Sequence, residues 1–151
     1  QYLTESLWQP MGCESDALWQ LDSEESGLEK AYCCIASNAR DFARLGKLYR
    51  DHGKWNGKQL LDSTFVATSV QPRFAESPHY GYGWWLLDYK GMHFFMMRKH
   101  LGQYVIANLT DDVIIVRLGH DTASKPSEET IYPQDIYDYI DEAYKMLGFR
   151  Y

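Results

Sequence analysis

The stretch Tyr80–Gly119 constrains the fold of this chain more than any other part of the sequence. It is dense in Tyr, Trp, Phe, Val and Ile, and turn residues interrupt these runs, a pattern typical of β-strands. Its middle holds a polar loop, Arg98–Gln103. Short links of hairpin length, Asp88–Gly91 and Thr110–Asp112, divide the rest. We therefore expect an antiparallel meander of up to four strands, over Tyr82–Leu87, Met92–Met97, Val105–Leu109 and Val113–Leu118.

Helical patterns flank this meander. Asn38 can cap a helix over Ala39–Asp51, and Asp41 stands three residues later, in the capping-box position. Asp62 can cap a shorter helix, Ser63–Val70, and the pattern near the C-terminus predicts a third, Gln134–Leu147, with one apolar stripe. The predicted fold class is therefore α+β: an antiparallel meander flanked by helices, with the C-terminal helix packed on the sheet. Residues 1–151 have the length of one domain.

Charge and composition exclude some partners. The net charge is −6, from 21 acidic and 15 basic residues, and a nucleic-acid-binding protein would need a basic face. No apolar run is long enough for a transmembrane segment. The cysteines Cys13, Cys33 and Cys34 form no recognisable disulfide framework and no C-x-x-C motif. We expect them to be small, buried apolar residues.

The sequence shows no complete nucleophile–base pair. A serine hydrolase needs a base beside its nucleophile, and no serine has a lysine three residues on. Ser37 comes closest, but Arg40 occupies that place and a guanidinium does not lose its proton. The five histidines lack the spacing of metal ligands, and no glycine-rich phosphate loop opens a helix. We expect neither a metal nor another cofactor.

The polar loop in the meander is the candidate site. Arg98, Lys99 and His100 bring positive charge to a strand end, where it could bind a substrate carboxylate or stabilise a developing anion. The alternative is a solvated corner between strands. Trp84 and Trp85 point to opposite faces of a strand, so one of them could line a cleft, or both could belong to an aromatic core.

The order of several short motifs resembles the C-terminal part of the serine beta-lactamase-like hydrolases, the superfamily of class C beta-lactamases and penicillin-binding proteins. Each motif is weakly specific, but five occur in the family's order over about residues 2 to 120. They are Leu7–Gly12 (LWQPMG), Ser37–Gly46 (SNARDFARLG), Gly53–Leu61 (GKWNGKQLL), Tyr80–Trp85 (YGYGWW), and Gly102–Tyr104 with Val113–Leu118.

The resemblance implies an active-site serine that is acylated by an amide or ester substrate. Water then hydrolyses this acyl-enzyme and frees the serine. In the family, the S-x-x-K and Y-x-N motifs lie upstream of the Trp-Gln-Pro region, and neither occurs in this sequence. The chain is thus expected to be the C-terminal portion of a larger beta-lactamase/transpeptidase-like domain, and to be inactive alone. The chain also lacks an initiator Met.

The family's third motif, K-T-G or H-x-G, is most similar to His100-Leu101-Gly102. By resemblance, His100 or Lys99 would position the substrate, and backbone N–H near Gly102 would help an oxyanion hole. The remaining candidates for substrate binding are Gln103, Arg98, Trp84 and Trp85.

The full-length protein implied by this resemblance is an esterase, amidase or peptidase of the bacterial periplasm or cell envelope. It would act on a small-molecule amide or ester, and the aromatic YGYGWW with the absent K-T-G favours an esterase or a 6-aminohexanoate-dimer-hydrolase-like activity over beta-lactam hydrolysis. We also expect association with the missing N-terminal part or with a second copy, because the sheet would otherwise keep an open edge. The alternative is a non-catalytic binding or structural module derived from the same fold.

Overall fold

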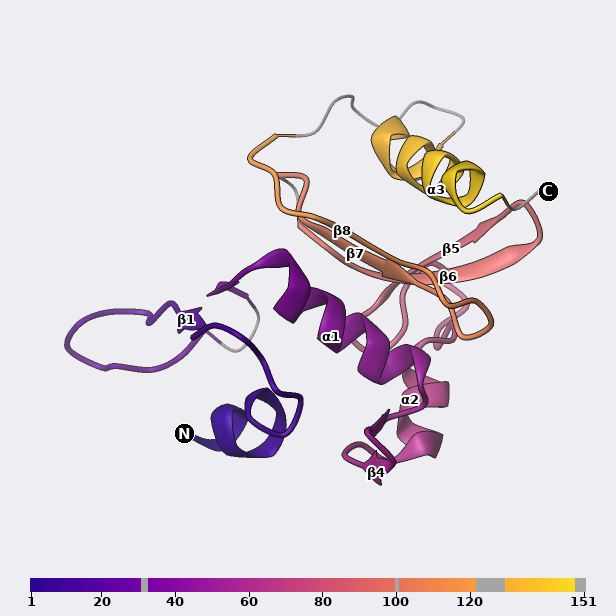
Figure 1. The fold of residues 1–151 in the computed structure, drawn as a ribbon. Coiled ribbons are helices and arrows are strands. Elements are labelled where there is room, and N and C mark those ends of the chain that lie inside the picture. The colour runs from indigo at the N-terminus through magenta and orange to yellow at the C-terminus, as the bar shows by residue number, and fades with distance from the viewer. Residues whose placement is uncertain (31–32, 100, 122–129, 149–151) are drawn as a thin grey trace.

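The computed structural model describes residues 1–30, 33–99, 101–121 and 130–148 (Figure 1). Its elements, in chain order, are a π-helical turn η1 (Thr4–Trp8), β1 (Leu18–Trp19), β2 (Ile35–Ala36), α1 (Ala39–Arg50), β3 (Lys54–Trp55), β4 (Lys58–Gln59), α2 (Ser63–Ser69), β5 (Trp85–Tyr89), β6 (Met92–Arg98), β7 (Tyr104–Ala107), β8 (Ile114–Arg117) and α3 (Gln134–Met146).

The predicted meander is confirmed. The strands β5, β6, β7 and β8 form one sheet in that order, and each pairs antiparallel with the next. Apolar residues face each other across it, as in the pairs Leu87–Phe94, Met96–Ile106 and Ile106–Ile115. With helices beside the sheet and the C-terminal helix on it, the α+β class is also confirmed.

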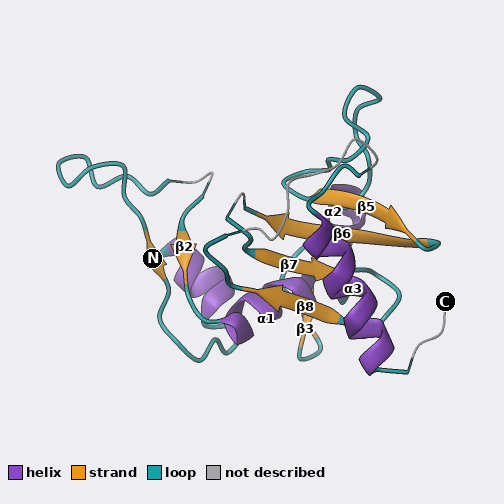
Figure 2. Ribbon diagram, turned by 90° about the horizontal axis from the view of Figure 1, so that it is seen from above, coloured by secondary structure: helices purple, strands orange, loops and turns teal. Residues whose placement is uncertain are grey.

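Both faces of the sheet are covered, which gives three layers (Figures 1 and 2). Successive side chains of a strand point to opposite faces. On one face, Phe94 and Met96 pack with Ile136 and Ile140 of α3 in a fully buried cluster. On the other face, Phe95 and its neighbours pack against residues before β5 and on α1. Two-sided burial explains why these strands are apolar almost throughout.

α1 lies close against the sheet because its middle residue is a glycine. A Cβ on Gly46 would stand 3.0 Å from Val105 and 3.1 Å from Ile114, so the helix backbone nearly touches β7 and β8. The helix begins as predicted: the side chain of Asn38 accepts a hydrogen bond from the N–H of Asp41 (2.9 Å).

β5 does not begin where the sequence pattern places it. It runs from Trp85 to Tyr89, and the turn to β6 is only Lys90 and Gly91, whose φ angles of 51° and 77° suit a two-residue hairpin turn. Gly81 instead lies against the end of α2, where a Cβ would come within 2.0 Å of the Ser69 carbonyl oxygen. Periodicity alone extends the strand backwards because aromatic residues alternate through this turn.

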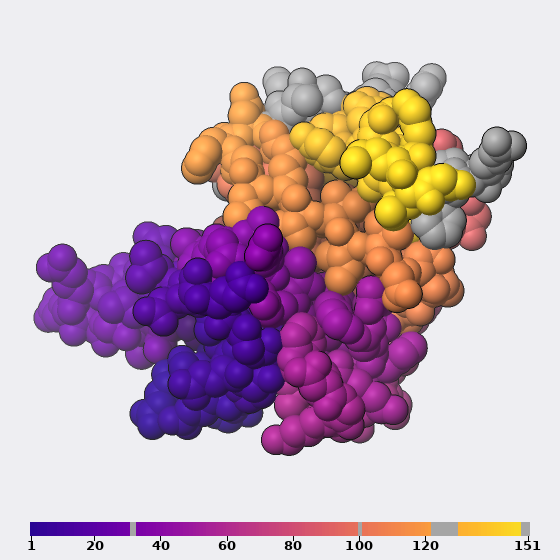
Figure 3. Space-filling model, viewed as in Figure 1, coloured from indigo at the N-terminus to yellow at the C-terminus, as the bar shows by residue number. Residues whose placement is uncertain are grey.

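The N-terminal region, up to β2, forms an arm beside the layers of sheet and helices. Figure 3 shows it, in indigo to purple, projecting from the rest of the molecule. β1 and β2 pair antiparallel within it, and close to β2 the chain carries a disulfide between the adjacent residues Cys33 and Cys34. The prediction that the cysteines are buried apolar residues is therefore wrong: all three are half-buried, and Cys33 and Cys34 are covalently joined. Within the described ranges, no helix is both long and apolar enough to cross a membrane.

Candidate functional site

The corner between β6 and β7 is a tight turn. The N–H of Lys99 donates to the carbonyl of Gln103 (3.0 Å), and the N–H of Gly102 donates to the carbonyl of Lys99 (3.2 Å). Gly102 has φ +79°, in the left-handed region that favours glycine. His100, the residue expected to act in the third motif, lies outside the described residues. We refer to the described residues here, 98, 99 and 101–103, as the corner.

Arg98 ends β6 on the α3 side of the sheet and lies among aromatic rings. Its guanidinium carbon is 5.3 Å from the ring centre of Trp85 and 5.4 Å from that of Tyr132. Its Nε is buried and has no hydrogen-bond partner within the described part of the chain. A guanidinium between two aromatic rings gains cation–π attraction, so the corner presents a fixed positive group.

Hydrogen bonds hold Gly102 and Gln103 to β8 and to the residues that follow it. Arg117 donates from Nη1 to the carbonyl of Gly102 and from Nε to the hydroxyl of Tyr139 (3.0 Å). A Cβ on Gly102 would fall 2.3 Å from the backbone oxygen of Asp121, which, with the positive φ, favours glycine there. The side chain of Gln103 donates to the carbonyl of Gly119. The N–H of Gly102 already serves the turn, so an oxyanion hole there stays a prediction.

The phenol hydroxyls of Tyr104 and Tyr132, beside Arg98, can donate hydrogen bonds but cannot act as bases. Burial raises the pKa of Tyr104 to about 12, with the negative charge of Asp135 acting in the same direction. Burial likewise raises the pKa of Tyr132 to about 12, although the positive charge of Arg98 opposes it. The hydroxyl of Tyr132 donates to the carbonyl of Leu86 (2.7 Å). At neutral pH this cluster can bind an anion, but neither tyrosine can take up a proton.

The two tryptophans have different surroundings. Trp84 is buried against Tyr49 and Phe95, at ring-centre distances of 4.5 and 5.0 Å, on the face away from Arg98. Trp85 is half-buried beside Arg98 and Tyr132. Of this pair, the structure brings only Trp85 to the corner, and Trp84 belongs to the core.

Lys99 points away from the sheet toward the N-terminal arm. It is exposed, and its Nζ lies 4.0 Å from the Sγ of Cys34, which is 65 residues away in the sequence. The corner is therefore in contact with the disulfide-bearing loop. In the described part of the chain, no group of three or more His, Cys, Asp or Glu side chains could hold a metal ion.

Two hollows lie elsewhere on the surface. One, of about 360 Å³, lies along α1 between Glu14, Arg44 and Trp55. The other, of about 600 Å³, lies near the start of β6 between Asp88 and Thr110. Corner residues line neither of these two hollows. In the described ranges, the corner thus offers charge and an aromatic surface, and enclosing a substrate would need another segment opposite it.

Sequence reasoning missed two residues of this cluster. Arg117 was counted only as part of a strand, although alternation puts it on the same face as its β7 partner Tyr104, which pairs with Arg98 in turn. Tyr132 precedes the predicted C-terminal helix and lies in no predicted strand or helix, yet it is fully buried. Strand alternation could have indicated the position of Arg117, whereas no sequence pattern indicated the burial of Tyr132.

Comparison with known proteins supports the fold more than the chemistry. No family model matches the sequence, and no curated protein does. Solved structures do match, 27 chains in all. One is described as "Putative 6-aminohexanoate-dimer hydrolase from Bacillus anthracis"; it is 25% identical with a TM-score of 0.78, and the match covers 100% of this chain and 39% of that one.

A second is described as "putative beta-lactamase from Bacteroides dorei DSM 17855", with 14% identity and a TM-score of 0.66 over 93% of this chain and 50% of that one. This level of identity shows the fold alone. Both are proteins of the beta-lactamase fold, so the resemblance drawn from the sequence motifs is confirmed. The chain spans half or less of the length of each of these two neighbours.

Proposed function

We propose that this chain, which has the fold of the beta-lactamase-like serine hydrolases, supplies one wall of the substrate site in a hydrolase of small amides or esters. The single observation that carries this proposal is the corner: a guanidinium held between Trp85 and Tyr132 at a strand end. In a substrate site, such a group would bind a carboxylate of the substrate, since arginine matches carboxylate geometry with paired N–H donors.

The nucleophile is proposed to come from residues outside this sequence. Two serine hydroxyls of the chain have weak acceptors beside them: that of Ser69 donates to the carbonyl of Val66 (2.9 Å), and that of Ser37 lies 3.5 Å from the carboxylate of Asp41, whose lowered pKa makes it a weak base. Without an effective base at hydrogen-bond distance, a hydroxyl is a weak nucleophile. The corner would then bind and orient the substrate, while the serine and lysine perform acyl transfer.

The proposed compartment is the periplasm or cell envelope. The disulfide Cys33–Cys34 adds support, because disulfides persist mainly in oxidising compartments.

Active-site labelling of the longest protein that contains this sequence tests the proposal. A fluorescent fluorophosphonate, which reacts with activated serines, should label that protein and leave the 151-residue chain unlabelled. Failure to label a folded longer protein would overturn the hydrolase proposal and favour a non-catalytic module.

A substitution at Arg98 tests the role of the corner separately. In the labelled protein, Arg98→Gln should lower kcat/KM for an ester bearing a carboxylate by roughly 10-fold or more, the effect of losing one charge-assisted contact. Hydrolysis of a neutral ester should change little. Arg73→Gln is the matched control, because Arg73 also lies over an aromatic ring, that of Tyr82 at 5.0 Å, but outside the corner. Equal losses on both esters would contradict an anion-binding role.

A further inference from the structure

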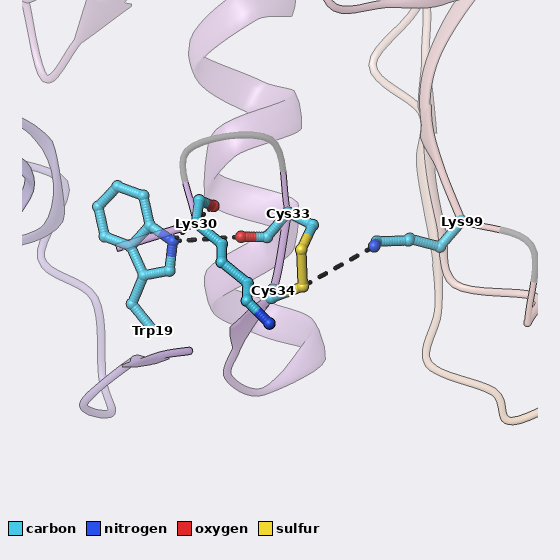
Figure 4. Close-up of a disulfide and its surroundings, with 5 residues drawn as sticks. All are labelled: Trp19, Lys30, Cys33, Cys34 and Lys99. Atoms are coloured by element: carbon cyan, nitrogen blue, oxygen red, sulfur yellow. Dashed lines mark hydrogen bonds between the residues drawn. A yellow bond between two sulfur atoms is a disulfide. The ribbon is translucent and has the colours of Figure 1, made fainter. Parts of the chain in front are cut away.

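The disulfide between Cys33 and Cys34 lies at the contact between the N-terminal arm and the corner. Figure 4 shows the two sulfur atoms between the loop that Trp19 holds and the side chain of Lys99. The ammonium Nζ of Lys99 is 4.0 Å from the Sγ of Cys34. Both cysteines are half-buried and Lys99 is exposed, so a small reagent can reach the bond from solvent.

The backbone of the pair is fixed independently of the sulfur–sulfur bond. The indole N–H of Trp19 donates to the carbonyls of Lys30 and Cys33, each at 3.1 Å, and the N–H of Gln20 donates to the carbonyl of Cys34 (3.0 Å). These contacts would keep the two sulfurs side by side after the bond opens, so the bond could close again.

Adjacency makes this an unusual disulfide. The two Cα atoms are 3.7 Å apart, below the range of about 4.4–6.8 Å that most disulfides have. Cys34 has φ +81°, in the left-handed region that residues other than glycine rarely adopt. Such a bond is easier to reduce than a relaxed disulfide that crosses a domain core.

We propose that Cys33–Cys34 is a thiol-exchange site, open to reduction by a small dithiol, at which Lys99 favours the departure of the Cys34 thiolate. The attacking thiolate bonds to the Sγ of Cys33, the bond between the cysteines breaks, and its electron pair goes to the Sγ of Cys34. The second thiol of the reagent then displaces Cys33. The protein gains two electrons and two protons, and the dithiol becomes a cyclic disulfide.

Lys99 acts on the leaving group. A positive charge beside the Sγ of Cys34 stabilises the thiolate that forms there, and a better leaving thiolate departs faster. The third cysteine does not compete: burial and, to a smaller extent, the nearby carboxylate of Asp41 together raise the pKa of Cys13 to about 11, so its thiol stays protonated at neutral pH.

Reduction kinetics test this proposal in the whole chain, in a Cys13→Ser background that leaves only the pair. Without reductant, Ellman's reagent should find no thiol in the denatured protein; after dithiothreitol it should find the thiols of Cys33 and Cys34. Lys99→Gln should slow reduction by roughly threefold, the order expected when a charge at 4 Å in water-like surroundings is lost. Lys99→Arg should restore most of the rate.

The matched control is Lys58→Gln, which removes an exposed lysine of β4 and should leave the rate unchanged. High salt should shrink the difference between the Lys99→Gln variant and its parent, because it screens exposed charges. Thiols that titrate before any reductant is added would overturn the disulfide, and equal rates in Lys99→Gln and Lys58→Gln would overturn the role of Lys99. The readout is thiol release and not turnover, so the outcome is independent of the proposed hydrolase function.

Discussion

Asp41 shows how one buried carboxylate holds the N-terminal segment onto α1. Its side chain is fully buried and accepts hydrogen bonds from the N–H groups of Glu14 (2.8 Å) and Ser15 (3.0 Å) and from Arg44 (2.8 Å). Burial opposes its ionisation, but these hydrogen bonds and the charge of Arg44 outweigh burial and lower the pKa of Asp41. The carboxylate joins segments that are distant in the sequence.

We predict that Asp41→Asn destabilises the chain by about 2–4 kcal/mol, since it leaves N–H groups and a guanidinium without their charged acceptor. Urea unfolding measures the loss. Arg40→Gln is the control: Arg40 is highly exposed, its Nη1 lies 3.8 Å from Glu14, and its replacement should change stability by no more than about 0.5 kcal/mol. Similar unfolding curves for the two variants would contradict this role of Asp41.

The lowered pKa of the same carboxylate makes the stability of the chain depend on pH. Because the pKa of Asp41 is lowered in the folded state, the unfolded chain binds its proton more readily, so the stabilisation is complete above the unfolded pKa of about 3.9. This stabilisation is lost as the pH falls below the unfolded pKa and through the lower pKa of the folded state. Stability measured from pH 6 downward should therefore fall less steeply in Asp41→Asn than in the parent chain, and parallel curves would exclude this linkage.

Among the elements, the approach to β5 depends on glycine. Gly81 lies against the Ser69 carbonyl oxygen at the end of α2, and the N–H of Tyr82 donates to that same oxygen (2.8 Å). Gly81→Ala should cost about 2–3 kcal/mol, because the contact is with backbone that cannot rotate away. Gly57→Ala, at φ +79° with open space around it, should cost only about 1 kcal/mol. Thermal unfolding would rank them, and the reverse order would refute the packing explanation.

α3 should contribute to stability as a core helix. Ile140 is fully buried against the sheet, so Ile140→Ala should cost about 2–5 kcal/mol through lost burial and the cavity that remains. Met146→Ala in the last turn of the same helix is the control, since Met146 is 84% exposed. Equal midpoints in guanidinium unfolding would mean that α3 does not dock on the sheet.

At the scale of the whole molecule, the N-terminal arm exposes apolar side chains to solvent. Leu18 and Leu28 in this arm are 75% and 63% exposed. We predict that the isolated chain associates at micromolar concentration, because exposed apolar side chains favour contact with another surface. Light scattering should give a mass above 17.6 kDa, and Leu18→Ser with Leu28→Ser should lower it.

Met146→Ser is the control for that experiment, since it removes an equally exposed apolar side chain at the end of α3. It should leave the mass unchanged. A parent chain that is monomeric at every concentration would contradict association through the arm.

The sequence by itself determined the local elements. Alternating aromatic and β-branched residues predicted the meander, and the Asn38 cap predicted the start of α1, because both signals act between near neighbours in the chain. Tertiary structure alone decided that Trp84 is core while Trp85 joins Arg98, that Tyr132 is buried, and that Lys99 meets Cys34. These contacts join residues far apart in the sequence, where neither periodicity nor capping carries a signal.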